Sequence, residues 1–143
     1  MAVFIALKEV KKLTGLQGRW QILSKKPLII CDTGHNPEGI AEVLQNIAAT
    51  PHQQLHFILG MVNDKDSSKI LNLLPKQAVY YFCKPDIPRG LSAEILKEQA
   101  QNYSLHGNDF YTVKEAFEAA KNNAQLNDLI FIGGSTFVVA EVV

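Results

Sequence analysis

The segment Pro27-Leu28-Ile29-Ile30-Cys31-Asp32-Thr33-Gly34-His35-Asn36-Pro37 joins a short apolar run to a helical pattern that begins near Glu38. The apolar run predicts a buried strand. Pro37 suits the first position of a helix, because its missing N–H would have no partner there, and Asn36 suits the cap before it. Ligands of α/β proteins bind at the carboxyl ends of the strands. A simple turn would explain most of this loop, but a turn does not require His35, so the loop is predicted to bind a ligand.

Strand-like and helix-like patterns alternate from Arg19 to the end of the chain. Apolar runs predict strands at Trp20–Leu23, Leu28–Cys31, Leu55–Leu59, Ala78–Cys83 and Leu129–Ile132, with a weak one around Phe110–Tyr111. Helical spacing of apolar residues predicts helices at Glu38–Ala49, Ser67–Leu74, Ser92–Tyr103 and Thr112–Ala124, while Ser135–Val143 fits a helix or a short strand. The strands are almost continuously apolar, which is typical of parallel strands covered on both faces. The pattern predicts an α/β fold with an open, mainly parallel, Rossmann-like sheet and helices on both faces.

The first residues differ from the rest of the chain. Residues 2–12 have the pattern of a short amphipathic helix, and a glycine-containing linker follows it. A helix that is separated from a domain by such a linker suggests the end of a preceding domain. We therefore expect residues 1–13 to be a tail helix with its linker, and residues 14–143 to form one domain of a larger protein.

Composition excludes several classes of function. The 143 residues carry 14 basic and 14 acidic side chains, a balance that argues against a nucleic-acid partner or an anionic membrane surface. No apolar run is long enough to span a membrane, and no secretory leader is recognisable. Cys31 and Cys83 both lie in apolar runs, which favours reduced core residues and a cytoplasmic location.

Four polar clusters follow predicted strands, so a parallel sheet would bring them to one edge. Each alone could be a turn or a helix cap. The residues in these clusters that could bind a ligand are Asp32, His35 and Asn36, then Asp64, Lys65 and Asp66, then Arg89, and finally Ser135. The chain has only two arginines, Arg19 and Arg89, and a guanidinium suits phosphate or carboxylate.

Several common catalytic motifs are missing from the sequence. It has no P-loop, no Gly-x-Gly-x-x-Gly fingerprint, no nucleophile elbow and no Cys-x-x-Cys pair. Asp32 and His35 could ligate a metal, but no third ligand stands at a useful spacing, so no metal site is predicted. The chain alone is not expected to hold a complete catalytic apparatus.

The order of these motifs identifies a family. The motifs are Gly18-Arg19-Trp20-Gln21, Asp32-Thr33-Gly34-His35-Asn36-Pro37, Gly60-Met61 with Asp64-Lys65-Asp66, Pro88-Arg89 and Gly134-Ser135. From about Thr14 to its end the chain resembles the C-terminal domain of folylpolyglutamate synthase/dihydrofolate synthase, which is similar to the C-terminal domain of Mur ligases. Thr33 and the pair Gly133-Gly134 depart from the residues that are commoner in the family.

The resemblance implies a ligase that joins L-glutamate to dihydropteroate or folate. ATP phosphorylates the substrate carboxylate, and the amine of glutamate attacks the acyl phosphate. The P-loop and the Mg2+ ligands would belong to an N-terminal ATPase domain, which would be the partner of this chain in a monomeric enzyme. By resemblance, Arg19 and Asp32 would contact ATP, and His35 and Ser135 would hold glutamate. Asn36, Arg89 and the Asp64-Lys65-Asp66 loop lie in matching motifs with less definite roles.

Two other functions remain open at the level of sequence. One is a Mur-type ligase domain of peptidoglycan synthesis, which the Asp-Lys-Asp and Gly-Arg-Trp motifs disfavour. The other is a free-standing α/β module that binds a small molecule. A receiver-like module would need an acidic pair after its first strand, and the first predicted strand is not followed by one.

Overall fold

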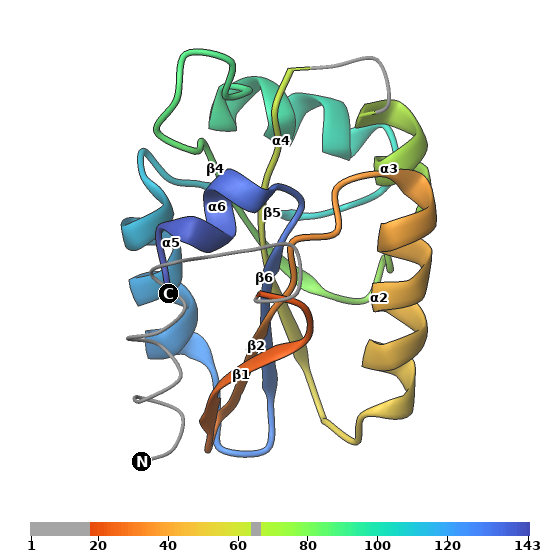
Figure 1. The fold of residues 1–143 in the computed structure, drawn as a ribbon, viewed down its shortest axis with the longest axis vertical. Helices are drawn as coiled ribbons and strands as arrows, with labels where there is room; N and C mark the ends of the chain where they lie inside the picture. Colours follow the sequence, from red (N-terminus) through yellow and green to blue (C-terminus); the bar gives the residue numbers. More distant parts are fainter. Residues whose placement is uncertain (1–17, 64–66) are drawn as a thin grey trace.

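The computed structural model describes residues 18–63 and 67–143, and the described part forms one six-stranded sheet with helices (Figure 1). The predicted helix at 2–12, its linker up to residue 17, and Asp64, Lys65 and Asp66 lie outside the described residues. The strands are arranged in the order β1-β2-β6-β3-β4-β5. The predicted α/β class, with an open and mainly parallel sheet, is confirmed.

The strands span Gln21–Lys25 (β1), Leu28–Cys31 (β2), Leu55–Gly60 (β3), Val79–Cys83 (β4), Gly107–Asp109 (β5) and Leu129–Gly133 (β6). Strand β1 pairs with β2 in antiparallel fashion, with an irregularity between Ile22 and Ser24. All other neighbours are parallel. The last strand, β6, lies between β2 and β3, so residues about a hundred positions apart in sequence become neighbours, as Ile30 and Phe131 do.

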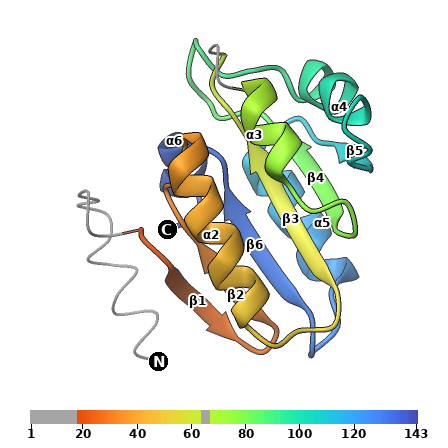
Figure 2. The ribbon, with the colours of Figure 1, turned by 90° about the vertical axis from the view of Figure 1, so that its right-hand side faces the viewer.

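The described helices span Pro37–Ala49 (α2), Ser67–Leu73 (α3), Ala93–Gln101 (α4), Val113–Asn123 (α5) and Thr136–Ala140 (α6). Figure 2 shows α2 and α3 in front of the sheet and α5 behind it. The core contacts agree, since α2, α3 and α4 contribute to one apolar cluster and α5 and α6 to another. The prediction of helices on both faces is therefore confirmed.

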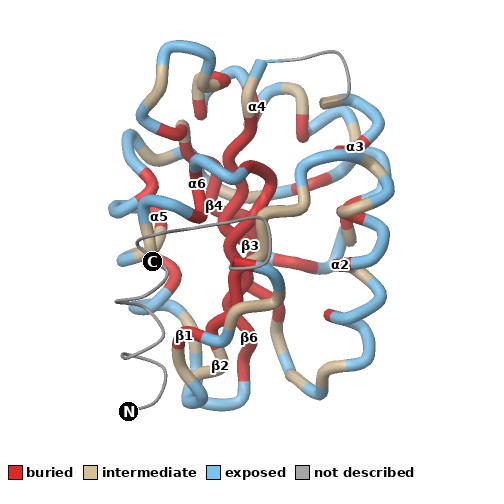
Figure 3. Tube along the Cα trace, in the orientation of Figure 1, coloured by how far each residue is buried: buried red, intermediate tan, exposed pale blue. Residues whose placement is uncertain are grey.

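Alternation along the strands divides the core into these two clusters. Phe57, Tyr80 and Phe131 face α2, α3 and α4, whereas Ile58 and Ile132 face α5 and α6. Buried residues follow the strands through the middle of the molecule (Figure 3). Because both faces are covered, the central strands are apolar at almost every position.

Two details of the sequence interpretation change. The weak strand around Phe110–Tyr111 is wrong, because the edge strand β5 is Gly107–Asp109. The final segment contains the short helix α6 and no strand. No helix in the described residues has the length and apolar character needed to cross a membrane.

Candidate functional site

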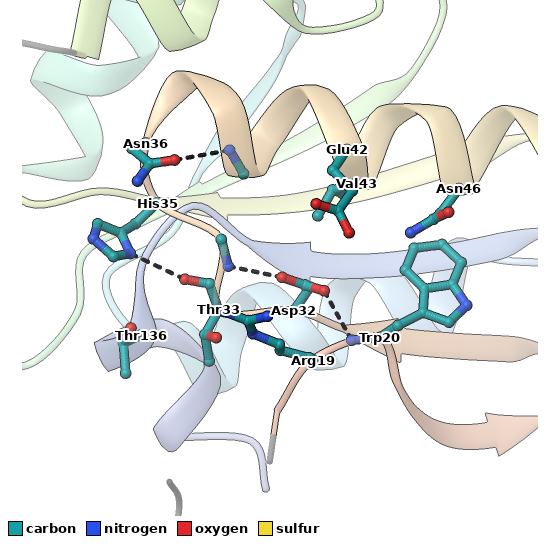
Figure 4. Close-up of a pocket in the computed structure, with 12 residues that line it drawn as sticks. Arg19, Trp20, Asp32, Thr33, His35, Asn36, Glu42, Val43, Asn46 and Thr136 are labelled. Atoms are coloured by element: carbon teal, nitrogen blue, oxygen red, sulfur yellow. Dashed lines mark hydrogen bonds between the residues drawn. The ribbon is translucent and has the colours of Figure 1, made fainter. Parts of the chain in front are cut away.

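A cleft of about 350 Å3 lies at the carboxyl end of β2, beside the start of α2 and of α6 (Figure 4). Four segments line it: the residues before β1, the β2–α2 loop, one face of α2 and the start of α6. The lining residues are Arg19, Trp20, Asp32, Thr33, Gly34, His35, Asn36, Gly39, Glu42, Val43, Asn46 and Thr136. The loop that the sequence predicts to bind a ligand thus forms the centre of a cleft.

The Asp32 carboxylate connects two walls of this cleft. Its Oδ2 accepts the backbone N–H of Trp20 at 2.8 Å, and its Oδ1 accepts that of Gly34 at 2.8 Å. A further hydrogen bond runs from Thr33 N–H to the Gly18 carbonyl oxygen at 3.0 Å. The residues before β1 are therefore held against the β2–α2 loop, and Arg19 reaches the cleft from them.

Helix α2 begins at the cleft as the sequence predicts. Pro37 occupies its first turn, and the Asn36 side chain accepts the Gly39 N–H at 2.7 Å. Gly34 and Gly39 allow this close approach, because a Cβ on Gly39 would stand 3.3 Å from the Gly34 Cα and 3.1 Å from the Asn36 Oδ1. The positive end of the α2 dipole therefore opens on the cleft, which favours a negatively charged ligand.

His35 is exposed on this loop. Its Nδ1 lies 3.3 Å from the Thr33 carbonyl oxygen, which makes Nδ1 the donor of that hydrogen bond. In the neutral ring, Nε2 is then the nitrogen that can accept a proton. The imidazole can therefore bind a donor group or, when it is protonated, an anion.

Ser135 follows β6 at the same edge of the sheet, but it does not line the cleft. It is 2% exposed, and its hydroxyl oxygen accepts the Phe137 N–H at 3.0 Å as the cap of α6. The adjacent residue, Thr136, reaches the cleft instead. Ser135 can still donate its hydroxyl proton, although its acceptor role is already used by the helix.

Arg89 is exposed in the loop after β4, also at the carboxyl end of the sheet. Its carbonyl oxygen accepts the Asn63 N–H at 2.8 Å, and Val62 and Gly90 form an antiparallel bridge. The loops after β3 and β4 are thus joined, one beside the other. Arg89 does not line the cleft that contains Asp32.

Sequence reasoning missed the contribution of α2. Gly39, Glu42, Val43 and Asn46 line the cleft, and their spacing of three and four residues places them on one side of the helix. That spacing, counted from the Asn36 cap, is the signal that could have found them.

Side chains that could ligate a metal do not cluster in the described part of the chain. Among the described residues there is no group of three or more His, Cys, Asp or Glu side chains that could hold a metal ion. The described residues that surround Asp32 therefore do not form a Mg2+ site by themselves.

Comparison with known proteins identifies the family of this chain. Residues 18–136 match the family described as Mur ligase, glutamate ligase domain. The chain belongs to this family. The match covers every described element from β1 to the start of α6, so the fold of the family includes both walls of the cleft.

Relatives of this glutamate ligase domain include synthases of folate metabolism. The dihydrofolate synthase/folylpolyglutamate synthase of Escherichia coli is 34% identical over 129 residues, which are 89% of this chain and 30% of that protein. The structure of E. coli FolC in complex with DHPP and ADP superposes with a TM-score of 0.80 at 32% identity and covers 87% of this chain and 30% of that one. The chain corresponds to the C-terminal domain of such synthases and spans about a third of their length.

A second synthase has been solved with a metal, a nucleotide and an amino acid bound. A bifunctional folylpolyglutamate synthase/dihydrofolate synthase with Mn, AMPPNP and L-glutamate bound gives a TM-score of 0.79 at 29% identity over 91% of this chain and 31% of that one. A UDP-N-acetylmuramoyl-L-alanyl-D-glutamate–2,6-diaminopimelate ligase of Listeria monocytogenes is 28% identical over 142 residues, covering 90% of this chain and 28% of that protein. Both types of relative are ligases.

Proposed function

We propose that this chain is the C-terminal domain of an ATP-dependent ligase that adds L-glutamate to dihydropteroate or folate through an acyl phosphate. The cleft around Asp32 carries the proposal, since it combines a guanidinium, a carboxylate, an imidazole and the positive end of a helix. These groups suit a nucleotide and an amino acid, because they recognise phosphate, ribose hydroxyls and carboxylate. The higher identity to the synthases favours this assignment over a peptidoglycan ligase.

Within this proposal each residue has a role. Arg19 neutralises phosphate charge of ATP, and the free lone pairs of Asp32 accept from ribose hydroxyls. His35 and Ser135 hold the incoming glutamate, with Ser135 acting through its hydroxyl proton. Asn36 caps the start of α2. Arg89 contributes to the site from the loop after β4. Asp64, Lys65 and Asp66 remain predicted contributors of that second loop.

The rest of the reaction requires a second domain. An N-terminal ATPase domain, which would end in the tail helix and linker of residues 1–13, would hold the β- and γ-phosphates and Mg2+. The complete enzyme would be a monomer in the cytoplasm. Phosphorylation would occur in that domain, and this chain would bind and orient ATP and glutamate across the cleft.

Amide resonances of the chain test the proposal directly. ADP should shift the resonances of Arg19, Trp20 and Gly34, and L-glutamate should shift those of His35 and Thr136. Meso-diaminopimelate serves as the matched control, because a peptidoglycan ligase would prefer it. Shifts that are confined to the opposite end of the sheet, around Gln54 and Asp128, would contradict the proposal.

The chain alone should not hydrolyse Mg2+-ATP. Nothing in the sequence corresponds to a P-loop that would hold the transferred phosphate. Phosphate release can be followed with the purified chain and excess ATP. Sustained turnover, lost on Arg19→Ala, would show that the chain is an ATPase in its own right.

A further inference from the structure

The residues that carry Arg19 have a backbone conformation that needs support from elsewhere. Gly18 has a φ of +84° and Trp20 a φ of +45°. A positive φ is unusual for a bulky side chain and persists only where neighbouring structure holds it. The hydrogen bonds from Trp20 N–H to Asp32 Oδ2 and from Thr33 N–H to the Gly18 carbonyl supply that support, at 2.8 and 3.0 Å.

Arg19 lies between the two residues that are tied in this way. Its main chain is therefore fixed on both sides, and its side chain is directed into the cleft beside Asp32 (Figure 4). The position of the guanidinium thus depends on Asp32 through the backbone. An arginine on an unsupported segment would have to lose more conformational freedom when it binds phosphate.

Residue type explains why an aspartate stands here. A carboxylate only accepts, and its two oxygens offer about four lone-pair positions. Two are used by the Trp20 and Gly34 N–H groups, so the others remain available to a ligand. An asparagine would turn an NH2 group toward one of these donors and lose that hydrogen bond.

We propose that Asp32 is a positioning residue that sets the place of Arg19 in the cleft by holding the Gly18–Trp20 segment. This inference rests on the proposed function only for the role of Arg19 toward phosphate. The carboxylate thereby couples the two halves of the nucleotide site: a ligand on its free lone pairs stabilises the same group that holds Arg19.

The first experiment needs no ligand. Trp20 is the single tryptophan of the chain, so its fluorescence reports on this segment alone. In Asp32→Asn, acrylamide should quench Trp20 more strongly, and the Thr33 amide should exchange about ten-fold faster, because its partner Gly18 is released. The Thr33 N–H does not bond to Asp32, so faster exchange there reports movement of the segment rather than loss of its own acceptor.

Asp128→Asn is the matched control. Asp128 also accepts two backbone N–H groups, from Gln54 and Gln125, but at the other end of the sheet. It should leave quenching of Trp20 and exchange of Thr33 unchanged. If Asp32→Asn fails to fold, Asp32→Glu replaces it, because the longer side chain moves the carboxylate away from the Trp20 N–H and should raise both readouts. Unchanged Trp20 quenching and Thr33 exchange in a folded variant of Asp32 would overturn the proposal.

A double-mutant cycle gives a readout that a merely structural role would not change. The Kd for ADP is measured by amide shifts for the chain, Arg19→Ala, Asp32→Asn and the double variant. If Asp32 positions Arg19, Arg19→Ala should weaken ADP binding strongly in the parent chain. In a chain that already carries Asp32→Asn, it should weaken ADP binding by less than about two-fold. Independent, additive losses would overturn it. Absence of ADP binding by the parent chain would contradict the proposed function, while the ligand-free experiment would still decide the role of Asp32.

Discussion

Single polar side chains build the loops of the cleft by accepting backbone N–H groups. Asn36 accepts from Gly39 at the start of α2, and Ser135 accepts from Phe137 at the start of α6. Each such cap stabilises a helix by about 1 kcal/mol. The same residue types bind ligands, so the sequence could locate the loops but could not separate the two roles at Ser135.

Arg19→Ala should weaken ADP binding by about 10- to 150-fold, which corresponds to the 1.5–3 kcal/mol of a charge-assisted hydrogen bond. Arg19→Lys is the control, because it keeps the charge and loses the planar fork. It should fall between the parent chain and the alanine variant. Titration of each variant with ADP gives the comparison, and equal affinities in all three would rule out a contact between Arg19 and phosphate.

Two residues with positive φ should respond differently to substitution. Gly134 has a φ of +100°, and a Cβ on it would stand 2.5 Å from the Gly60 carbonyl oxygen. Gly134→Ala should therefore lower the free energy of unfolding by more than about 1 kcal/mol. Ser104 has a φ of +62° at an exposed position, so Ser104→Gly should cost little or should stabilise by up to about 1 kcal/mol. Urea denaturation of both variants is the measurement, and a neutral Gly134→Ala would contradict the clash.

A buried polar network joins β3, β4 and the start of β6 at the end of the sheet away from the cleft. His56 Nε2 lies 2.9 Å from Asp128 Oδ2, and His56 Nδ1 lies 2.8 Å from the Tyr81 hydroxyl. Asn123, the last residue of α5, donates to the same hydroxyl at 3.3 Å. Every polar group here has a partner, so the network fixes the register of the strands without leaving a buried group unsatisfied.

Asp128→Asn should lower the free energy of unfolding by about 1.5–3 kcal/mol at neutral pH, because hydrogen bonds to a charged group are lost. Asp109→Asn is the control, since Asp109 is an exposed carboxylate 3.5 Å from Lys97 and should contribute less than about 1 kcal/mol. Urea denaturation of the two variants and the parent chain gives these differences.

The same variant has a pH signature. Burial raises the pKa of Asp128, but hydrogen bonds from Gln125, His56 and Gln54 together with the charge of His56 outweigh it and hold the pKa below 3.8. A carboxyl group whose pKa is lowered by folding stabilises fully above its unfolded pKa and loses this contribution as the pH falls. The difference between the parent chain and Asp128→Asn should therefore shrink as the pH falls below 3.8. A difference that grows toward acid would contradict this assignment.

The extent to which elements could be predicted follows from their burial. Strands β3, β4 and β6 are apolar over nearly their whole length, so the sequence located them within a residue or two. Strand β5 lies at the sheet edge and consists of the polar residues Gly107, Asn108 and Asp109. An edge strand need not be apolar, and the apolar Phe110 beside it packs on Tyr81 with ring centroids 5.9 Å apart. The apolar signal therefore pointed to the residues that follow the strand.

The parallel sheet explains why polar clusters that are separate in the sequence could be assigned to one edge. Residues after β2, β3, β4 and β6 all lie at its carboxyl end. The sequence could not show which of them share a cleft, because this depends on distances across the sheet. Asp32 and His35 line the cleft with Arg19, whereas Arg89 lies in the pair of loops after β3 and β4.

The reactivity of the two cysteine thiols reports on how completely the helices cover the sheet. Burial, with the nearby charge of Asp32, raises the pKa of the Cys31 thiol to about 12, and burial with the charge of Glu141 raises that of Cys83 to about 12. At about pH 8 neither should be a thiolate in the folded chain, so dithionitrobenzoate should react only as the chain unfolds. Urea should release both thiols together in one transition. A thiol that reacts at the rate of free cysteine in the native chain would contradict the packing of its face.

The central place of β6 has a consequence for the time at which the cleft can form. Until residues 129–133 are available, β2 lacks the neighbour that joins it to β3, and the sheet consists of two unconnected parts. Closing such a long loop is slow, so this strand should be inserted late in folding. During synthesis, β6 must therefore leave the ribosome before Asp32 and Thr136 can meet, and a nascent chain arrested before β6 cannot form this cleft.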